Sequence, residues 1–313
     1  MPELDAFLAT FQVHFRRSEG KAALERYLTG LLTEVANKNC GTLAVAVPGT
    51  SAQRLQEFLT NMQWDEEDLT RQRVHKMIAA ATFGHGVLIF DDTGFAKQGK
   101  HAVGVARQYA GTRGKVGNGQ VAVTCCYNDP QASWPGAVRL SLPREWAEEP
   151  ERWRRARVPA AVPFQTKPQI ALALLDQARA WGVPHRCVVA DADYGDNPTF
   201  LVGVEARGAR YVAAVRADFA GRPKRHGTPL RQRADQVLAA LRRCPWRTIR
   251  WRQGAKGWLR QKCGAVRAGR ITAEGEAHIG WLLGERAARG QAEEYKYYWS
   301  NLPASTSVET LVD

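Results

Sequence analysis

Two pairs of aspartates stand directly after short apolar runs. Asp91 and Asp92 follow the run Gly86–Phe90, while Asp191 ends the run CVVAD and Asp193 comes two positions later. Short apolar runs bounded by turn residues are typical of buried strands. Each run therefore predicts a strand that brings carboxylates to its carboxyl end, where ligands bind in open α/β sheets.

Carboxylates from two neighbouring strand ends have the chemistry of a divalent metal site. Their hard oxygens are the ligands that Mg²⁺ and Mn²⁺ prefer. Two such ions can activate a water molecule or a 3′-hydroxyl and stabilise the leaving oxygen of a phosphodiester. The alternative is that both aspartate clusters are only turn formers. The occurrence of two clusters in a chain that also carries a basic segment favours the metal site.

The positive charge of the chain is concentrated in that segment. The 313 residues carry a net charge of +13, whereas residues 221–270 alone hold 15 Lys and Arg against one acid. Arg neutralises phosphates and the interleaved Trp side chains can stack on bases, although a solvated β face with Trp in its core is the alternative. Such an imbalance without a polyanion is costly, so the segment favours contact with double-stranded DNA. The residues expected to make that contact are Arg242, Arg243, Arg247, Arg250, Arg252, Lys256 and Arg260.

The elements that position these residues fall into four segments. Residues 1–83 predict a helical domain, with apolar residues at helical spacing in Ala22–Val35 and with Ser51 and Asp65 as helix caps. Residues 84–220 alternate strands and helices and predict an α/β block. Residues 221–293 predict a mostly β insertion with a basic face. Residues 294–313 predict an apolar strand followed by the first turns of a helix.

Composition narrows the class of protein further. Hydrophobic residues make up 44% of the chain, which argues against global disorder. No apolar run is long enough to span a membrane, and the first residues lack the pattern of a signal peptide, so a cytoplasmic protein is expected. The six cysteines have no zinc spacing and are expected to be reduced thiols, several of them in the core.

Four phrases of the sequence resemble a known family. LIFDDTGFAKQGKHAVGVARQYAGTRGKVGNGQVAV (Leu88–Val123) is similar to the first catalytic segment of DDE transposases from bacterial insertion sequences, in particular the group numbered seven hundred and one. VVADADYGDNPTFLVGVEARGARYVAAVR (Val188–Arg216) resembles the segment with their second acid, and Tyr297–Val312 resembles the stretch before their third. Phe58–Gln72 also resembles that group, so the resemblance extends over nearly the whole chain.

The resemblance implies an RNase H-like mixed sheet flanked by helices, with a β insertion before the last helix. It assigns binding of Mg²⁺ or Mn²⁺ to Asp92 and Asp191 as catalytic residues, with lesser roles for Asp91 and Asp193. The third acid of the family is a Glu on a helix after the last strand. Glu309 precedes its expected position and is not assigned that role.

The resemblance therefore predicts a cut-and-paste DNA transposase that is nucleoid-associated and able to form a homodimer on DNA, and whose residues 1–313 end before the third acid. A chain of this kind is expected to bind DNA and to be inactive in transposition by itself. Two alternatives stay open: an inactive transposase remnant, and a DNA-binding regulator without catalysis.

Overall fold

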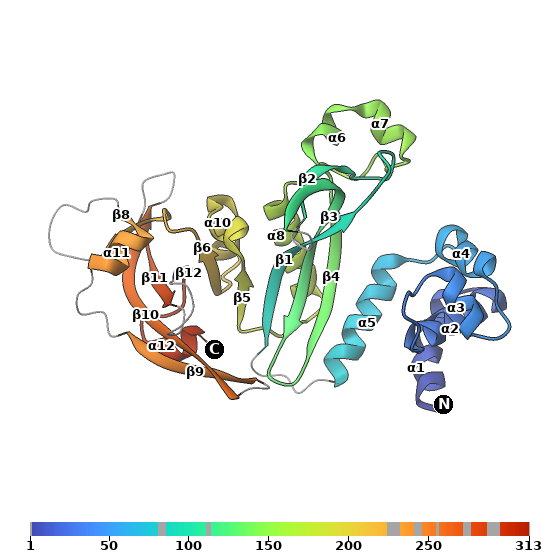
Figure 1. The fold of residues 1–313 in the computed structure, drawn as a ribbon, viewed down its shortest axis with the longest axis horizontal. Helices are drawn as coiled ribbons and strands as arrows, with labels where there is room; N and C mark the ends of the chain where they lie inside the picture. The colour runs from blue at the N-terminus through green and yellow to red at the C-terminus, as the bar shows by residue number, and fades with distance from the viewer. Residues whose placement is uncertain are drawn as a thin grey trace. The chain divides into compact units, whose positions relative to one another are not determined.

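The structure is a computed structural model that describes residues 2–80, 86–110, 114–223, 232–240, 246–254, 257–271, 277–286 and 295–312. The chain divides into two compact units, Met1–Ala80 and Ala81–Asp313, and each is described by itself (Figure 1). Arg242, Arg243 and Lys256, which were predicted to contact DNA, lie outside the described residues.

The N-terminal unit is helical. Its core contains Leu8, Phe11, Phe15, Leu24 and Phe58. The side chain of Ser51 accepts a hydrogen bond from the Arg54 amide, and that of Asp65 accepts one from the Asp68 amide, so both residues cap helices as their sequence positions indicated. Its elements are α1 (Pro2–Phe11), η1 (Gln12–His14), α2 (Ser18–Leu32), α3 (Cys40–Ala46), α4 (Ala52–Asn61) and α5 (Glu66–Ala80).

The second unit is built on a mixed sheet. Strand β1 (Val87–Ala96) pairs antiparallel with β3 (Lys115–Asn128) and parallel with β5 (Cys187–Ala190), which in turn pairs parallel with β6 (Tyr211–Val215). Strand β3 also pairs with β2 (Ala106–Ala110) and β4 (Ser133–Ser141). The apolar runs that predicted buried strands thus lie side by side at the centre of the sheet.

Helices cover one face of these central strands. Leu88 and Phe90 are almost fully buried, and the Phe90 ring lies 6.4 Å from the ring of Phe200 in α10 (Pro198–Ala206). Helix α8 (Lys167–Ala180) packs in the same layer and buries the side chains of Ile170, Leu174 and Leu175. Two short helices, α6 (Arg144–Glu148) and α7 (Pro150–Arg155), and the four-residue α9 (Ala192–Gly195) complete this half.

The predicted insertion extends the same sheet. Beyond β6 the strand order continues through β12 (Tyr295–Ser300), β11 (Ala277–Arg286), β10 (Gly257–Ile271), β7 (Ala220–Pro223) and β8 (Gln232–Arg233). Strand β9 (Arg247–Gly254) pairs with β10, and α11 (Ala234–Ala240) and α12 (Val308–Val312) flank these strands. Ile249, Cys263, Leu283 and Leu311 form their apolar cluster.

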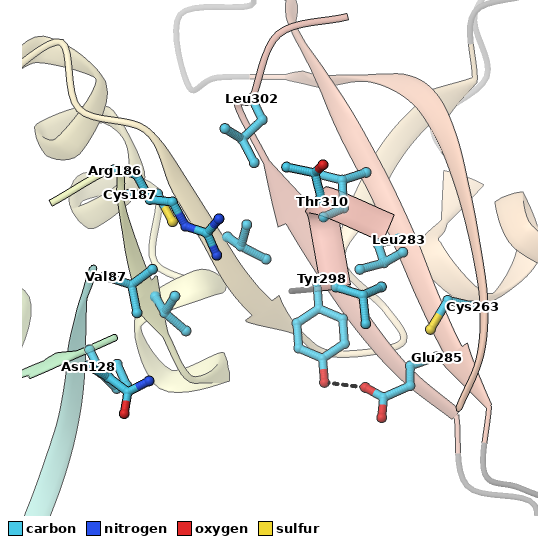
Figure 2. Close-up of a pocket in the computed structure, with 15 residues that line it drawn as sticks. Val87, Asn128, Arg186, Cys187, Cys263, Leu283, Glu285, Tyr298, Leu302 and Thr310 are labelled. Atoms are coloured by element: carbon cyan, nitrogen blue, oxygen red, sulfur yellow. Dashed lines mark hydrogen bonds between the residues drawn. The ribbon is translucent and has the colours of Figure 1, made fainter. Parts of the chain in front are cut away.

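The other face of the central strands borders an apolar cavity of about 320 Å³. Val87, Ile89, Cys187 and Val189 line one side, because alternation along β1 and β5 turns these residues away from α8 and α10. The opposite side belongs to β11, β12 and α12. Figure 2 shows the hydroxyl of Tyr298 bound to Glu285 at this side. Tyr298 and Leu302 both line this cavity.

The strand order β4-β3-β1-β5-β6, with β3 antiparallel and β5 and β6 parallel, is a mixed sheet flanked by helices, the RNase H-like arrangement. The fold class predicted for the chain is therefore confirmed. Among the described helices, none has both the length and the apolar character that crossing a bilayer requires.

Candidate active site

The two aspartate clusters follow the point where the parallel pairing of β1 with β5 ends. Strand β5 ends there as predicted, whereas β1, which was predicted to end before Asp91, continues to Ala96 because Asp91 and Asp92 stay paired with β3. Phe90 of β1 is in register with Ala190 of β5, so Asp91 and Asp191 are the residues that directly follow this last paired position. Strand β5 ends there, because Asp191 caps α9 and its side chain accepts a hydrogen bond from the Asp193 amide at 3.0 Å. The fold thus brings together two segments separated by about a hundred positions of sequence.

Asp92 points to the face of the sheet that the helices cover. It shares this face with Leu88 and Phe90 by strand alternation, and its side chain is 20% exposed. Its Oδ1 accepts a hydrogen bond of 2.7 Å from the Tyr194 hydroxyl, and its Oδ2 forms an ion pair with the ammonium of Lys167. Both carboxylate oxygens of Asp92 therefore have a partner.

Asp91 lies on the opposite face of β1 and is exposed. The pKa of the Asp191 carboxyl is raised, first by partial loss of water around it and then by the negative charges of Asp193 and Asp91. The pKa of the Tyr194 hydroxyl is also raised, by burial and then by the carboxylates of Asp92, Asp191 and Asp91. Tyr194 is thus a protonated donor among three acids.

Gly195 makes the close packing of α9 on β6 feasible. A Cβ atom on this residue would lie 1.8 Å from the carbonyl oxygen of Ala214. No side chain fits at that distance, so the sequence Tyr-Gly sets α9, and with it Asp191 and Tyr194, directly against the sheet. Tyr194 is 1% exposed and its ring lies 5.2 Å from that of Phe200.

Arg216 restrains the far end of the acidic turn. Its guanidinium pairs with Asp193 at 2.8 Å and with Asp196 at 3.5 Å, and its amide donates to Asp196. Burial raises the pKa of the Asp196 carboxyl, while these bonds to Arg216 act against the rise. Asp193 is therefore engaged by a cation on the outside of the turn.

Lys167, Tyr194 and Arg216 were not assigned roles from the sequence. Tyr194 stands in the Asp-Ala-Asp-Tyr-Gly phrase that carries the family resemblance, and this was the available signal. Lys167 and Arg216 follow no recognisable motif. Their contacts arise only when α8 and β6 are in place.

The donor atoms at these strand ends suit a divalent cation in part. Asp92, Asp191 and Asp91 supply hard carboxylate oxygens of the kind that Mg²⁺ and Mn²⁺ bind. Within the described residues, however, no group of three or more His, Cys, Asp or Glu side chains is arranged to hold a metal ion. The chemistry of the donors fits such an ion, whereas a complete ligand set is not assembled in this part of the chain.

Strands β9 and β10 present one basic and one apolar face. Arg250 is directly opposite Arg260, Thr248 is opposite Lys262, and these four side chains are exposed. Cross-strand Arg pairs repel each other, which favours an anionic partner on this face. Arg252 lies on β9, but its side chain is outside the described part.

Other basic residues of the segment are used within the protein. Arg247 shares a face with the buried Ile249 and pairs with Glu309 at 3.3 Å. Arg270 is 4% exposed and pairs with Glu205 at 2.9 Å, and Arg267 stacks on Trp281. The charge count of the segment therefore overstates the cations available to DNA.

Comparisons with known proteins agree with this architecture. Residues 10–258 match the family model described as DDE superfamily endonuclease. Over 195 residues, 62% of this chain and 48% of the relative, the sequence is 30% identical to the probable transposase for insertion sequence element IS701 of Microchaete diplosiphon. The chain thus spans about half the length of this curated relative. The NurA nuclease of Sulfolobus solfataricus covers 76% of the chain at 9% identity, with a TM-score of 0.32, which is too low to bear on fold or function.

The chain thus has an RNase H-like mixed sheet with acids next to the point where the pairing of its parallel strands β1 and β5 ends. The chain belongs to the DDE superfamily of endonucleases, as the family match over most of its length shows. The resemblance found in the sequence predicted this family, and the prediction is confirmed.

Proposed function

We propose that this protein is a DNA transposase of an insertion sequence, acting in the cytoplasm on the ends of its own element by metal-dependent phosphodiester hydrolysis and strand transfer. The observation that carries the proposal is the parallel pairing of β1 with β5, which ends at Phe90 and Ala190, directly before the acids of both clusters. The relative named as a probable IS701 transposase supports the substrate class.

In this proposal Asp92 and Asp191 hold the divalent ion, Mg²⁺ or Mn²⁺. When bound, the ion would polarise the phosphodiester and the attacking oxygen. The chain's own residues orient the carboxylates: Tyr194 holds Oδ1 of Asp92, and the start of α9 holds Asp191. Arg250 and Arg260 would bind the phosphate backbone of double-stranded DNA.

The third carboxylate is proposed to come from outside residues 1–313 or from a second copy of the chain bound to the same DNA. Glu309 is a poor candidate, because it is exposed and its carboxylate pairs with Arg247 of β9. The pKa of this carboxyl is lowered, through backbone and Arg247 hydrogen bonds, so it is a stable anion already engaged by a cation.

Residues 1–313, Mn²⁺ and DNA carrying the sequences that flank the gene would test the proposal. We expect Mn²⁺ binding that is lost in Asp92→Asn and Asp191→Asn, duplex binding that weakens with salt, and no nicking at the element ends. Mn²⁺ binding that is equal in wild type and both variants would refute the proposed site. End-specific nicking that depends on Asp92 would instead refute the need for an external third acid.

A second candidate function is a DNA-binding protein without catalysis. The exposed basic face of β9 and β10 favours it independently of the acids. In that case the same DNA binding would be found, and neither aspartate substitution would alter the binding of Mn²⁺.

A further inference from the structure

Lys167 contacts the candidate site but has no role in the function proposed so far. It is the first residue of α8, and its ammonium pairs with Oδ2 of Asp92 across 75 positions of sequence. Its side chain is 36% exposed, and that of Asp92 is 20% exposed. The Lys167 ammonium therefore occupies Oδ2 of Asp92, a carboxylate oxygen that a divalent cation would need as a ligand.

The two partners of Asp92 differ in how firmly they are held. Tyr194 is 1% exposed, and its ring packs on Phe200. Lys167 has a flexible stem and access to water, so its ammonium can leave Asp92 at little cost. One carboxylate oxygen is thus bound by a fixed donor and the other by a mobile cation.

The ion pair is not needed to begin α8. The amide of Thr166 donates to the Gln169 side chain at 2.9 Å, and these two residues form a capping box. Pro168 in the first turn supports the same start. Since the helix has its own cap, the contact between Lys167 and Asp92 is not explained by the start of α8.

We propose that Lys167 is the exchangeable counter-ion of Asp92. Its ammonium occupies Oδ2 and is displaced when a divalent cation binds the carboxylate, while Tyr194 keeps Asp92 oriented through Oδ1. The inference rests on the proposed function, because it requires Asp92 to be a metal ligand. Lys167 and Tyr194 are positioning residues with opposite effects: the first competes with the metal and the second prepares its ligand.

Mn²⁺ titration of residues 1–313, followed by electron paramagnetic resonance, tests the proposal without any activity. Lys167→Met should bind Mn²⁺ about two- to fivefold more tightly, the range expected for removal of a partly exposed ion pair. Lys167→Arg keeps the charge and should stay close to wild type. Tyr194→Phe should bind about tenfold more weakly, as expected for loss of a hydrogen bond that orients a ligand.

Lys115→Met is the matched control. Lys115 is an exposed lysine at the start of β3, eight residues along that strand from Val123, the partner of Asp92, which is roughly 27 Å. A charge at that distance is screened at ordinary ionic strength. This variant should therefore bind Mn²⁺ like the wild type, which separates a local effect of Lys167 from a change in net charge.

A double-mutant cycle with Asp92→Asn decides the mechanism. If Lys167 acts through Asp92, Lys167→Met should not restore the Mn²⁺ binding that Asp92→Asn removes. Unchanged or weaker binding by Lys167→Met alone, or Mn²⁺ binding that Lys167→Met restores in the Asp92→Asn background, would overturn the inference and leave the proposed function intact. Undiminished Mn²⁺ binding in Asp92→Asn itself would refute the metal site. If Lys167→Met fails to fold, Lys167→Gln replaces it.

Discussion

The close approach of α9 to β6 predicts a severe effect of Gly195→Ala. The added Cβ would lie 1.8 Å from the Ala214 carbonyl oxygen, a backbone atom that no rotamer change can move. Either α9 or β6 must shift, and overpacking of this kind costs about 1–3 kcal/mol or more. With a cost of about 3 kcal/mol, the midpoint of thermal unfolding should fall by about 6–12 °C.

The same shift should disturb the site. Asp191 and Tyr194 belong to the turn that Gly195 anchors, so we expect Gly195→Ala to weaken Mn²⁺ binding even below its unfolding temperature. Circular dichroism melting and Mn²⁺ titration of the same preparation measure the two effects.

Two other glycines supply controls. Gly203→Ala would place a Cβ 2.4 Å from Cδ1 of Leu172, a side chain that can turn away, and it also gains helix propensity. Gly99→Ala meets no atom within 4 Å. Both should melt within about 3 °C of wild type. A Gly195→Ala variant that melts and binds Mn²⁺ like these controls would refute the packing argument.

Three more predictions follow from the charges. Folding raises the pKa of the Asp191 carboxyl, so the ionised carboxylate destabilises the folded protein at pH values above its ordinary pKa of 3.8. Asp191→Asn should therefore raise the midpoint of thermal unfolding at pH 7. This gain should fade as the pH falls toward 4, where the carboxyl of the wild type becomes protonated. Replacing both Arg250 and Arg260 by Gln should weaken duplex binding and reduce its logarithmic salt slope by about two, measured by fluorescence anisotropy. Glu205→Gln leaves Arg270 buried without its counter-charge and should lower the free energy of unfolding by about 3–5 kcal/mol in urea titrations.

Each of these expectations can fail in a specific way. A lower unfolding midpoint for Asp191→Asn at pH 7 would mean that the Asp191 carboxylate stabilises the turn more than its partial burial and the neighbouring negative charges destabilise it. An unchanged salt slope in the double Arg variant would exclude the β9 and β10 face as a DNA surface. A Glu205→Gln variant as stable as wild type would mean that Arg270 finds other acceptors.

The central strands could be predicted from the sequence because their signals are local. The apolar runs before Asp91 and Asp191 are short and lack polar residues, so two strands followed directly. The end of β5 before Asp191 was predicted correctly, whereas the turn formers after Phe90 did not end β1, which stays paired with β3 as far as Ala96. The caps at Ser51 and Asp65 are equally local. The resemblance then supplied the fold class, which periodicity alone does not contain.

The partners of Asp92 could not be predicted, since they depend on tertiary packing. Lys167 and Tyr194 reach it across 75 and 102 positions. Asp91 and Asp92 are adjacent in sequence, yet alternation sends them to opposite faces, and only the register with β5 shows that Asp91 is the one beside Asp191.

For the basic segment, the sequence predicted the total charge but not which individual cations are exposed. A count of Arg and Lys does not distinguish Arg250, which faces solvent, from Arg270, which neutralises Glu205 inside the protein. The distinction depends on strand alternation and on the packing that brings Glu205 of α10 to Arg270 of β10, 65 positions away in sequence.

The location of a bound Mn²⁺ ion tests the central claim most directly. Crystals of residues 1–313 soaked in Mn²⁺ would reveal it by anomalous scattering. The account predicts a peak within ligand distance, about 2.0–2.6 Å, of carboxylate oxygens of both Asp92 and Asp191, with the Lys167 ammonium displaced and the Tyr194 hydroxyl still on Asp92. A peak held by Asp91 and Asp191, with Lys167 still paired to Asp92, would contradict it.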